Sequence, residues 1–176
     1  LKHGNTISDP QHKVDDTHLK TFDYGFANPP FSVKGWMKGA QANDPFGRWG
    51  VGDNVAPVPP PKCGDYAFLL HMITSLKSGG KGAIILPHGV LFRGNAEGEI
   101  RKFIVGKHII AGIIGLPANL FFGTGIPACI IILDKGGALT SKGIFMIDAK
   151  EGFAKDGAKN RLRECDIRRI VDTWEA

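Results

Sequence analysis

The stretch FDYGFANPPF, residues 22–31, decides the fold of this chain. Its first six residues are mostly apolar and aromatic, which predicts a strand. Two prolines then fix φ and remove two backbone donors, and Asn28, which precedes them, is pushed into an extended conformation. We therefore expect a stiff loop at the carboxyl end of a strand, presenting the Asn28 amide, outward carbonyls and the Phe31 ring.

Such a loop suits an exocyclic amino group on a flat ring. The lone pair of a conjugated NH2 is delocalised, so an enzyme that alkylates it must localise that pair with acceptors placed around the two N–H bonds. The Asn28 side-chain oxygen and the Pro29 carbonyl can accept without taking a charge. Phe31 can stack on the ring, a contact worth about 1–3 kcal/mol per base. The alternative is that Asn28-Pro29-Pro30 forms only a turn.

The surrounding sequence resembles the modification (methyltransferase) subunit of type I restriction–modification systems, an N6-adenine DNA methyltransferase family. The resemblance covers most of residues 1–150 and rests on collinear segments at 22–37, 65–87, 88–95 and 113–134. It implies site-specific DNA adenine methylation with S-adenosylmethionine, with Asn28, Pro29, Pro30 and Phe31 as the catalytic motif. It further implies double-stranded DNA, a specificity subunit and a restriction subunit as partners.

The resemblance also suggests an aromatic contact to a flipped adenine from Phe121 or Phe122. A ring on the far side of the base would offset part of the few kcal/mol lost in unstacking it. Adjacent strand residues point to opposite faces, so we expect one phenylalanine in the core. Of the two, Phe121 is favoured for the base.

Residues for the cofactor are sparse in this chain. By resemblance, Asn5 and Thr6 belong to a loop near the cofactor's adenine ring, although Asn5 is equally an ordinary turn residue. No glycine-rich turn precedes Asn28; the glycines of 78–82 indicate a helix stop and those of 123–125 a hairpin turn. We therefore expect the second half of a catalytic domain, truncated at its amino end and inactive alone.

The patterns predict an α/β fold, the second half of a Rossmann-like, doubly wound class I methyltransferase sheet with a closing antiparallel hairpin. Residues 1–150 form the partial catalytic domain and 151–176 an extension of loop and amphipathic helix. Residues 32–63 form a long loop whose aromatic content favours binding of DNA or substrate. Helices are expected at 65–76, capped by Asp65, and from Asn95 or Glu97 to 105, and strands at 82–86, 109–116, 128–133 and 144–147.

Composition narrows the setting. No apolar stretch reaches the ~18–20 residues that span a bilayer, so no membrane association is expected. The net charge of +5 suits a polyanionic partner without demonstrating one. Three widely spaced cysteines fit a reducing cytoplasm, and the six histidines show no metal-ligand spacing, so no metal site is expected.

Two further alternatives remain open. Protein glutamine methyltransferases also use Asn-Pro-Pro-aromatic, usually with tyrosine, and there an aromatic pair such as Phe121-Phe122 is not expected. A non-catalytic module that binds DNA or partner subunits is the other. Nothing in the sequence encodes a DNA target, which a specificity subunit would read.

Overall fold

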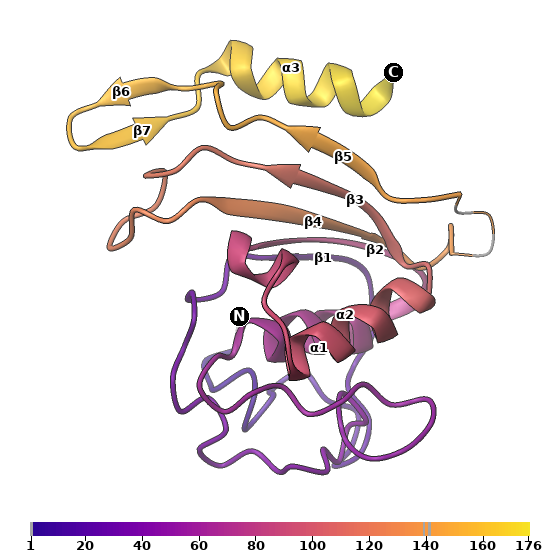
Figure 1. The fold of residues 1–176 in the computed structure, drawn as a ribbon. Helices are drawn as coiled ribbons and strands as arrows, with labels where there is room; N and C mark the ends of the chain where they lie inside the picture. Colours follow the sequence, from indigo (N-terminus) through magenta and orange to yellow (C-terminus); the bar gives the residue numbers. More distant parts are fainter. Residues whose placement is uncertain (1, 139, 141) are drawn as a thin grey trace.

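A five-stranded mixed sheet organises the chain (Figure 1). The computed structural model describes residues 2–138, 140 and 142–176. The strand order is β1-β2-β4-β3-β5, with β1 parallel to β2, β4 antiparallel to both β2 and β3, and β5 parallel to β3. The strands are β1 (Phe22–Ala27), β2 (Leu76–Pro87), β3 (Ile110–Gly115), β4 (Ala128–Asp134) and β5 (Phe145–Asp148).

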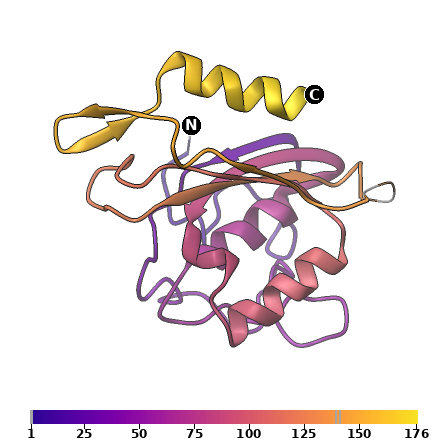
Figure 2. The ribbon, with the colours of Figure 1, turned by 45° about the horizontal axis from the view of Figure 1, so that its top comes forward.

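Helices cover both faces of this sheet. Helices α1 (Asp65–Ser75) and α2 (Ala96–Gly106) lie together on one face, and α3 (Glu164–Glu175) lies over the other, as both views show (Figures 1 and 2). A short 3-10 turn, η1 (His88–Leu91), leads from β2 towards α2. The predicted α/β class is confirmed, with its β1-α1-β2 parallel crossover and its antiparallel β3–β4 pair.

The core lies between the sheet and the two helices α1 and α2. Alternate residues of the interior strand β2, Ile84 and Leu86, are fully buried, and Ile100 and Ile104 of α2 pack in the same cluster. The apolar residues that repeat every 3.6 positions in the helices and every two positions in the strands therefore face the same interior. The predicted helices and strands appear at their expected places to within two residues, except that β2 begins at Leu76, well before the expected residue 82.

The glycines at 78–82 do not stop α1 as predicted. The helix ends at Ser75 and β2 begins at Leu76. Lys135 donates to the carbonyls of Ile73 (3.2 Å) and Leu76 (2.7 Å), so a lysine beyond β4 satisfies the carbonyls at the helix end. The pairing of β1 with β2 jumps from Phe22↔Leu76 to Tyr24↔Lys81, which leaves the intervening residues as a bulge.

The tryptophans of the long loop (residues 32–63) are structural, which corrects the prediction that its aromatic residues bind DNA or substrate. Trp36 and Trp49 are 5% and 0% exposed, and their rings meet edge to face at 5.3 Å. Their indole N–H groups donate to the carbonyls of Pro60 (2.9 Å) and Gln41 (3.0 Å). These buried indole rings, whose N–H groups are hydrogen-bonded, give the long loop a packed interior although it has no regular secondary structure.

A short antiparallel sheet near the carboxyl end was not predicted from the sequence. Residues 151–176 were expected to form a loop and a helix, but a two-stranded antiparallel sheet precedes α3: β6 (Ala154–Asp156) and β7 (Lys159–Arg161). Helix α3 packs on β5 through Trp174, whose ring is 5.8 Å from that of Phe145. In Figures 1 and 2 the β6–β7 hairpin projects beside the connection between β3 and β4.

Candidate active site

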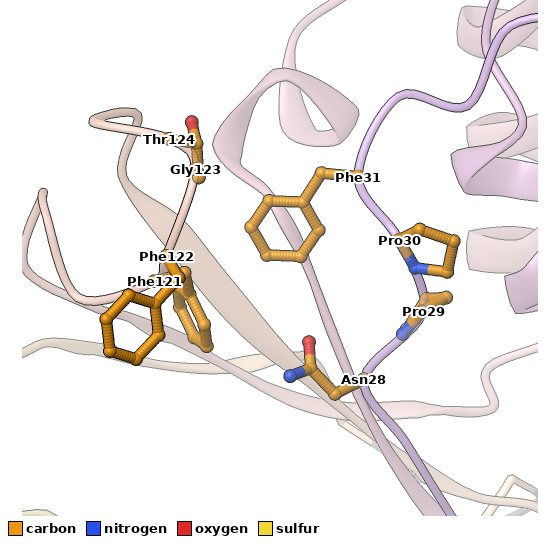
Figure 3. Close-up of a pocket in the computed structure, with 8 residues that line it drawn as sticks. All are labelled: Asn28, Pro29, Pro30, Phe31, Phe121, Phe122, Gly123 and Thr124. Atoms are coloured by element: carbon orange, nitrogen blue, oxygen red, sulfur yellow. The ribbon is translucent and has the colours of Figure 1, made fainter.

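The amide loop (residues 28–31) begins where β1 ends and faces open space. Pro29 is buried, whereas Asn28 and Pro30 are exposed. Among the described residues, nothing hydrogen-bonds the Asn28 amide or the Pro29 carbonyl, so both are free to accept from a ligand. Figure 3 shows the Asn28 amide and the Phe31 ring projecting towards the same space.

Ser32 fixes the direction in which the chain leaves the amide loop. Its φ of 51° lies in the left-handed region, which is uncommon for a residue with a side chain. The Asp65 carboxylate holds this conformation, because Ser32 donates to it through its backbone N–H (2.7 Å) and through its hydroxyl (3.4 Å). Asp65 is therefore not the helix cap that the sequence predicts. Gly64 precedes α1 without a side-chain capping bond, and Asp65 reaches across to the loop.

Asp65 belongs to a buried ionic network. Its side chain is 0% exposed and pairs at 2.6 Å with Arg93, which also pairs with the buried carboxylate of Glu97. Burial works against the charge of Arg93, but hydrogen bonds to Glu97 and Asp65 prevail and raise its pKa, so it stays cationic. The Cys63 thiol donates to Asp65 at 3.1 Å, and burial raises its pKa to about 11. A protonated, engaged thiol is no nucleophile.

The aromatic turn (residues 118–126) faces the amide loop from the connection between β3 and β4. The rings of Phe31 and Phe121 approach edge to face, with centroids 5.3 Å apart. Phe121 is half-buried and Phe122 is 94% exposed, so neither lies in the core. The prediction of one core phenylalanine is wrong because the two residues lie in a turn, where strand alternation does not apply.

The loop and the turn enclose one cavity of about 650 Å³ (Figure 3). Its lining residues are Asn28, Pro29, Pro30, Phe31, Phe121, Phe122, Gly123 and Thr124. The structure thus brings together six of the eight residues that the sequence singled out. The described lining carries three aromatic rings, one side-chain amide and no titratable group, which suits a flat, neutral ligand rather than an ion.

The other two predicted residues, Asn5 and Thr6, lie outside this cavity. The Asn5 side-chain oxygen accepts from the backbone N–H groups of Ile7 and Ser8, both at 3.0 Å, so it is committed to its own turn. Thr6 borders a groove of about 170 Å³ that runs along β1 past Phe26 and Ala27, just before the amide loop.

Three further findings concern the described residues. They contain no group of three or more His, Cys, Asp or Glu that could hold a metal ion. None of their helices is long and apolar enough to cross a membrane. His71 is a satisfied structural residue: Arg48 donates to its Nδ1 at 3.2 Å, and burial together with Arg48 lowers its pKa to about 4.

Sequence reasoning missed the Asp65–Arg93–Glu97 network that supports the site. Part of the signal was local, since Arg93 precedes α2 and lies four residues before Glu97 in its first turn, the spacing of a helical ion pair. The pairing of Asp65 with Arg93 spans 28 residues and leaves no periodic trace.

Comparisons with known proteins agree with this arrangement. The family model N-6 DNA Methylase matches residues 1–176. The HindI methylase subunit of a type I restriction enzyme from Haemophilus influenzae is 36% identical over 175 residues, 98% of this chain and 37% of that protein. The MjaIX methylase subunit from Methanocaldococcus jannaschii is 35% identical over 172 residues, 96% of this chain and 30% of that protein.

A solved structure shows the same fold. The methyltransferase subunit of a type I restriction–modification system from Streptococcus thermophilus superposes with a TM-score of 0.77 at 35% identity, covering 97% of this chain and 34% of that one. The present chain therefore spans about a third of the length of the relatives it matches.

Proposed function

The chain belongs to the N-6 DNA methylase family, and from this premise we propose that its cavity holds the adenine of a DNA substrate for methylation at N6. The modification subunit of a type I restriction–modification system is the setting we propose. The single observation that carries the proposal is the pair of free acceptors, Asn28 Oδ1 and the Pro29 carbonyl, at the edge of a cavity lined by aromatic rings.

The acceptors account for the activation of the amino group. The adenine N6 lone pair is delocalised into the ring, and both N–H bonds donate. Acceptance of these bonds by Asn28 and Pro29 returns electron density to the nitrogen without placing a charge in the cavity. Acceptors that are already in place need no reorganisation during the reaction, which is the usual source of electrostatic catalysis.

The aromatic residues account for the binding of a base taken out of the duplex. Phe31 offers a ring against one face of the base. The Phe121 ring now contacts that of Phe31 edge to face at 5.3 Å, so it must move aside when a base enters and then cover the other face. Stacking of about 1–3 kcal/mol per ring is comparable with the few kcal/mol lost when a base leaves the helix.

The amino group loses a proton when it is alkylated. Since the described lining of the cavity has no titratable side chain, that proton passes to water rather than to a general base. The amide loop therefore contributes by binding, orienting and polarising the nucleophile.

We propose S-adenosylmethionine as the methyl donor, which supplies an electrophilic methyl group when bound. The described residues fit it only in part: Thr6 borders the groove beside β1, while the Asn5 oxygen is engaged in its own turn. This chain thus supplies the acceptor for the methyl group and little of the donor's binding site. We expect it to be inactive alone.

The partners follow from the relatives. Their names are those of type I restriction enzyme subunits, so we propose double-stranded DNA, a specificity subunit and a restriction subunit as partners in the cytoplasm. The net charge of +5 favours a polyanion.

A protein glutamine methyltransferase is the weaker candidate. A glutamine amide needs the same two acceptors, but it is small and flexible. The second wall, with Phe121 opposite Phe31, matches a flat base better than a side-chain amide.

The test compares Asn28→Ala with Asn54→Ala. Asn54 is an exposed asparagine that does not line the cavity. Both are placed in a methylase subunit of the relatives' length that carries residues 1–176, with its specificity subunit, and N6-methyladenine is measured by mass spectrometry. Loss of one preorganised hydrogen-bonding partner predicts that kcat falls by about 10²–10³-fold for Asn28→Ala alone. Equal activity of the two variants contradicts the proposal, as does the absence of methylated DNA with the unsubstituted protein.

A further inference from the structure

The β6–β7 hairpin fastens the aromatic turn. Lys159 donates through its ammonium to two carbonyls of that turn, those of Phe121 (2.8 Å) and Thr124 (2.9 Å). The next residue, Asn160, donates from its side chain to Ala118 (2.7 Å) and from its backbone to Asn119 (2.9 Å). Four hydrogen bonds from two adjacent residues therefore reach the turn at both of its sides.

These bonds concern the part of the turn that faces the cavity. The Phe121 carbonyl that Lys159 holds belongs to the residue whose ring contacts Phe31, and Thr124 also lines the cavity. Within the turn itself the described bonds are fewer: Asn119 donates to the Gly125 carbonyl (3.3 Å), and Ile126 donates to the Thr124 hydroxyl (3.2 Å). Without the hairpin, no described hydrogen bond would fix the segment from Leu120 to Gly123.

The residues of the hairpin suit this task. Asn160 is 7% exposed, and a buried side-chain amide needs a hydrogen-bonding partner, which the turn supplies. An ammonium group donates strong, charge-assisted bonds and can serve two carbonyls at once. Gly157, with a φ of 58°, allows the tight turn that brings Lys159 opposite Asp156.

We propose that Lys159 and Asn160 are positioning residues for adenine methylation: they hold the aromatic turn so that Phe121 lies opposite Phe31, where its ring can cover the second face of the base. The inference rests on the proposed function of the cavity. It gives residues 154–161, which lie outside the expected catalytic domain, an indirect structural role in the active site. Neither residue lines the cavity, so each acts through the aromatic turn.

Lys155 provides a matched control. It lies on β6 of the same hairpin, is exposed, and places its ammonium 5.6 Å from the Phe153 ring. Lys155→Ala and Lys159→Ala each remove one positive charge from the same hairpin. A purely electrostatic contribution to DNA binding therefore predicts equal effects of the two substitutions.

The experiment uses a methylase subunit of the relatives' length with its specificity subunit and a duplex that has 2-aminopurine at the target adenine. We expect Lys159→Ala to reduce the fluorescence rise on binding and to lower kcat by about 10- to 100-fold, the cost of a misplaced contact. The Kd for DNA should change as little as in Lys155→Ala. Lys159→Arg, which can also donate to two carbonyls, should restore most of the activity. Asn160→Ala should resemble Lys159→Ala.

Hydrogen exchange of residues 118–126 in the same proteins tests the attachment without reference to activity. Exchange should accelerate in Lys159→Ala and not in Lys155→Ala. If the unsubstituted protein neither methylates DNA nor extrudes the base, the proposed function fails, while the exchange result still judges the attachment. If that protein is active and the two lysine variants match in kcat and exchange, the positioning role is overturned.

Discussion

The two walls of the cavity are held in opposite ways. The amide loop is attached to the interior: Ser32 binds Asp65, which is fully buried and paired with Arg93. The aromatic turn is attached to the periphery: its carbonyls are bound by Lys159 and Asn160 of a hairpin that projects from the sheet. One wall depends on the core of the fold and the other on an appendage.

This difference matches the tasks of the two walls. Acceptors for an amino group act only at hydrogen-bonding distance. The ionic network keeps them there, because it cannot rearrange without leaving a buried charge unpaired. A ring that must let a base enter and leave needs less constraint. The hydrogen bonds from Lys159 and Asn160 are partly buried and contribute about 0.5–1.5 kcal/mol each, less than the buried ion pair, so the turn can yield while the amide loop does not.

The largest expected effect comes from Arg93→Met, which removes the cation between Asp65 and Glu97. Both carboxylates are nearly unexposed, and a buried charge that loses its partner costs about 3–5 kcal/mol of unfolding free energy. The check is urea unfolding followed by circular dichroism. Arg168→Met, on the exposed face of α3, is the control and should lie within about 0.5 kcal/mol of the unsubstituted protein. Equal losses for the two variants would show that the buried network does not support the amide loop.

The next expected effect is a dependence of the unfolding free energy on pH, caused by His71. This side chain contacts the long loop, because Arg48 of that loop donates to it. Its pKa is lowered to about 4 in the folded protein, against about 6.5 when unfolded. The unfolded state therefore binds more protons between these values, and stability falls as pH drops from about 6.5 to 4, by at most about 3 kcal/mol.

His71→Gln keeps an acceptor for Arg48 and removes the titration. Urea unfolding at pH 7 and pH 5 should show a smaller pH effect for this variant than for His3→Gln, an exposed histidine. If both variants retain the full pH effect, carboxylates rather than His71 cause it.

A smaller effect is expected on the other wall. Lys159→Ala removes two bonds near solvent, so global stability should fall by about 1 kcal/mol, well below the loss in Arg93→Met. The same urea titration measures both variants. A loss as large as that of Arg93→Met would erase the distinction between an interior wall and a peripheral one.

The smallest effect separates the two phenylalanines of the turn. Phe122→Ala should leave unfolding free energy unchanged within about 0.5 kcal/mol, because the ring is 94% exposed. Phe121→Ala should lose the edge contact with Phe31, about 0.5–1.5 kcal/mol. Thermal unfolding of both variants checks the order, and a greater loss for Phe122→Ala would reverse the assignment of Phe121 to the base.

The local sequence pattern predicted most of the helices and strands, since the buried apolar residues of each repeat with the period of a helix or of a strand. The run 65–76 and the apolar strand around Ile84 both appear as expected. The stop signal of α1 was misassigned: the glycines 78–82 lie within β2, and the carbonyl of Leu76 is satisfied by Lys135, 59 residues further along the chain. The β6–β7 hairpin was missed although Asp156-Gly157 is a hairpin signal, because its strands have three residues each and no apolar alternation.

The site was predictable where chemistry is contiguous in sequence. Asn28 to Phe31 form one motif, and Phe121 lies opposite them as the resemblance implied. The supports were not predictable, because Asp65 and Lys159 act on backbone groups more than 30 residues away. Trp36 and Trp49 were misassigned for a related reason: composition alone does not tell a packed loop from a binding loop.

The most direct measurement is a structure of a methylase subunit of the relatives' length, carrying residues 1–176, with its specificity subunit and target duplex. We predict the target adenine outside the helix, between Phe31 and Phe121, with N6 about 3 Å from both Asn28 Oδ1 and the Pro29 carbonyl. An adenine that remains stacked in the duplex, or one extruded to a place away from these two acceptors, would contradict the role of the amide loop.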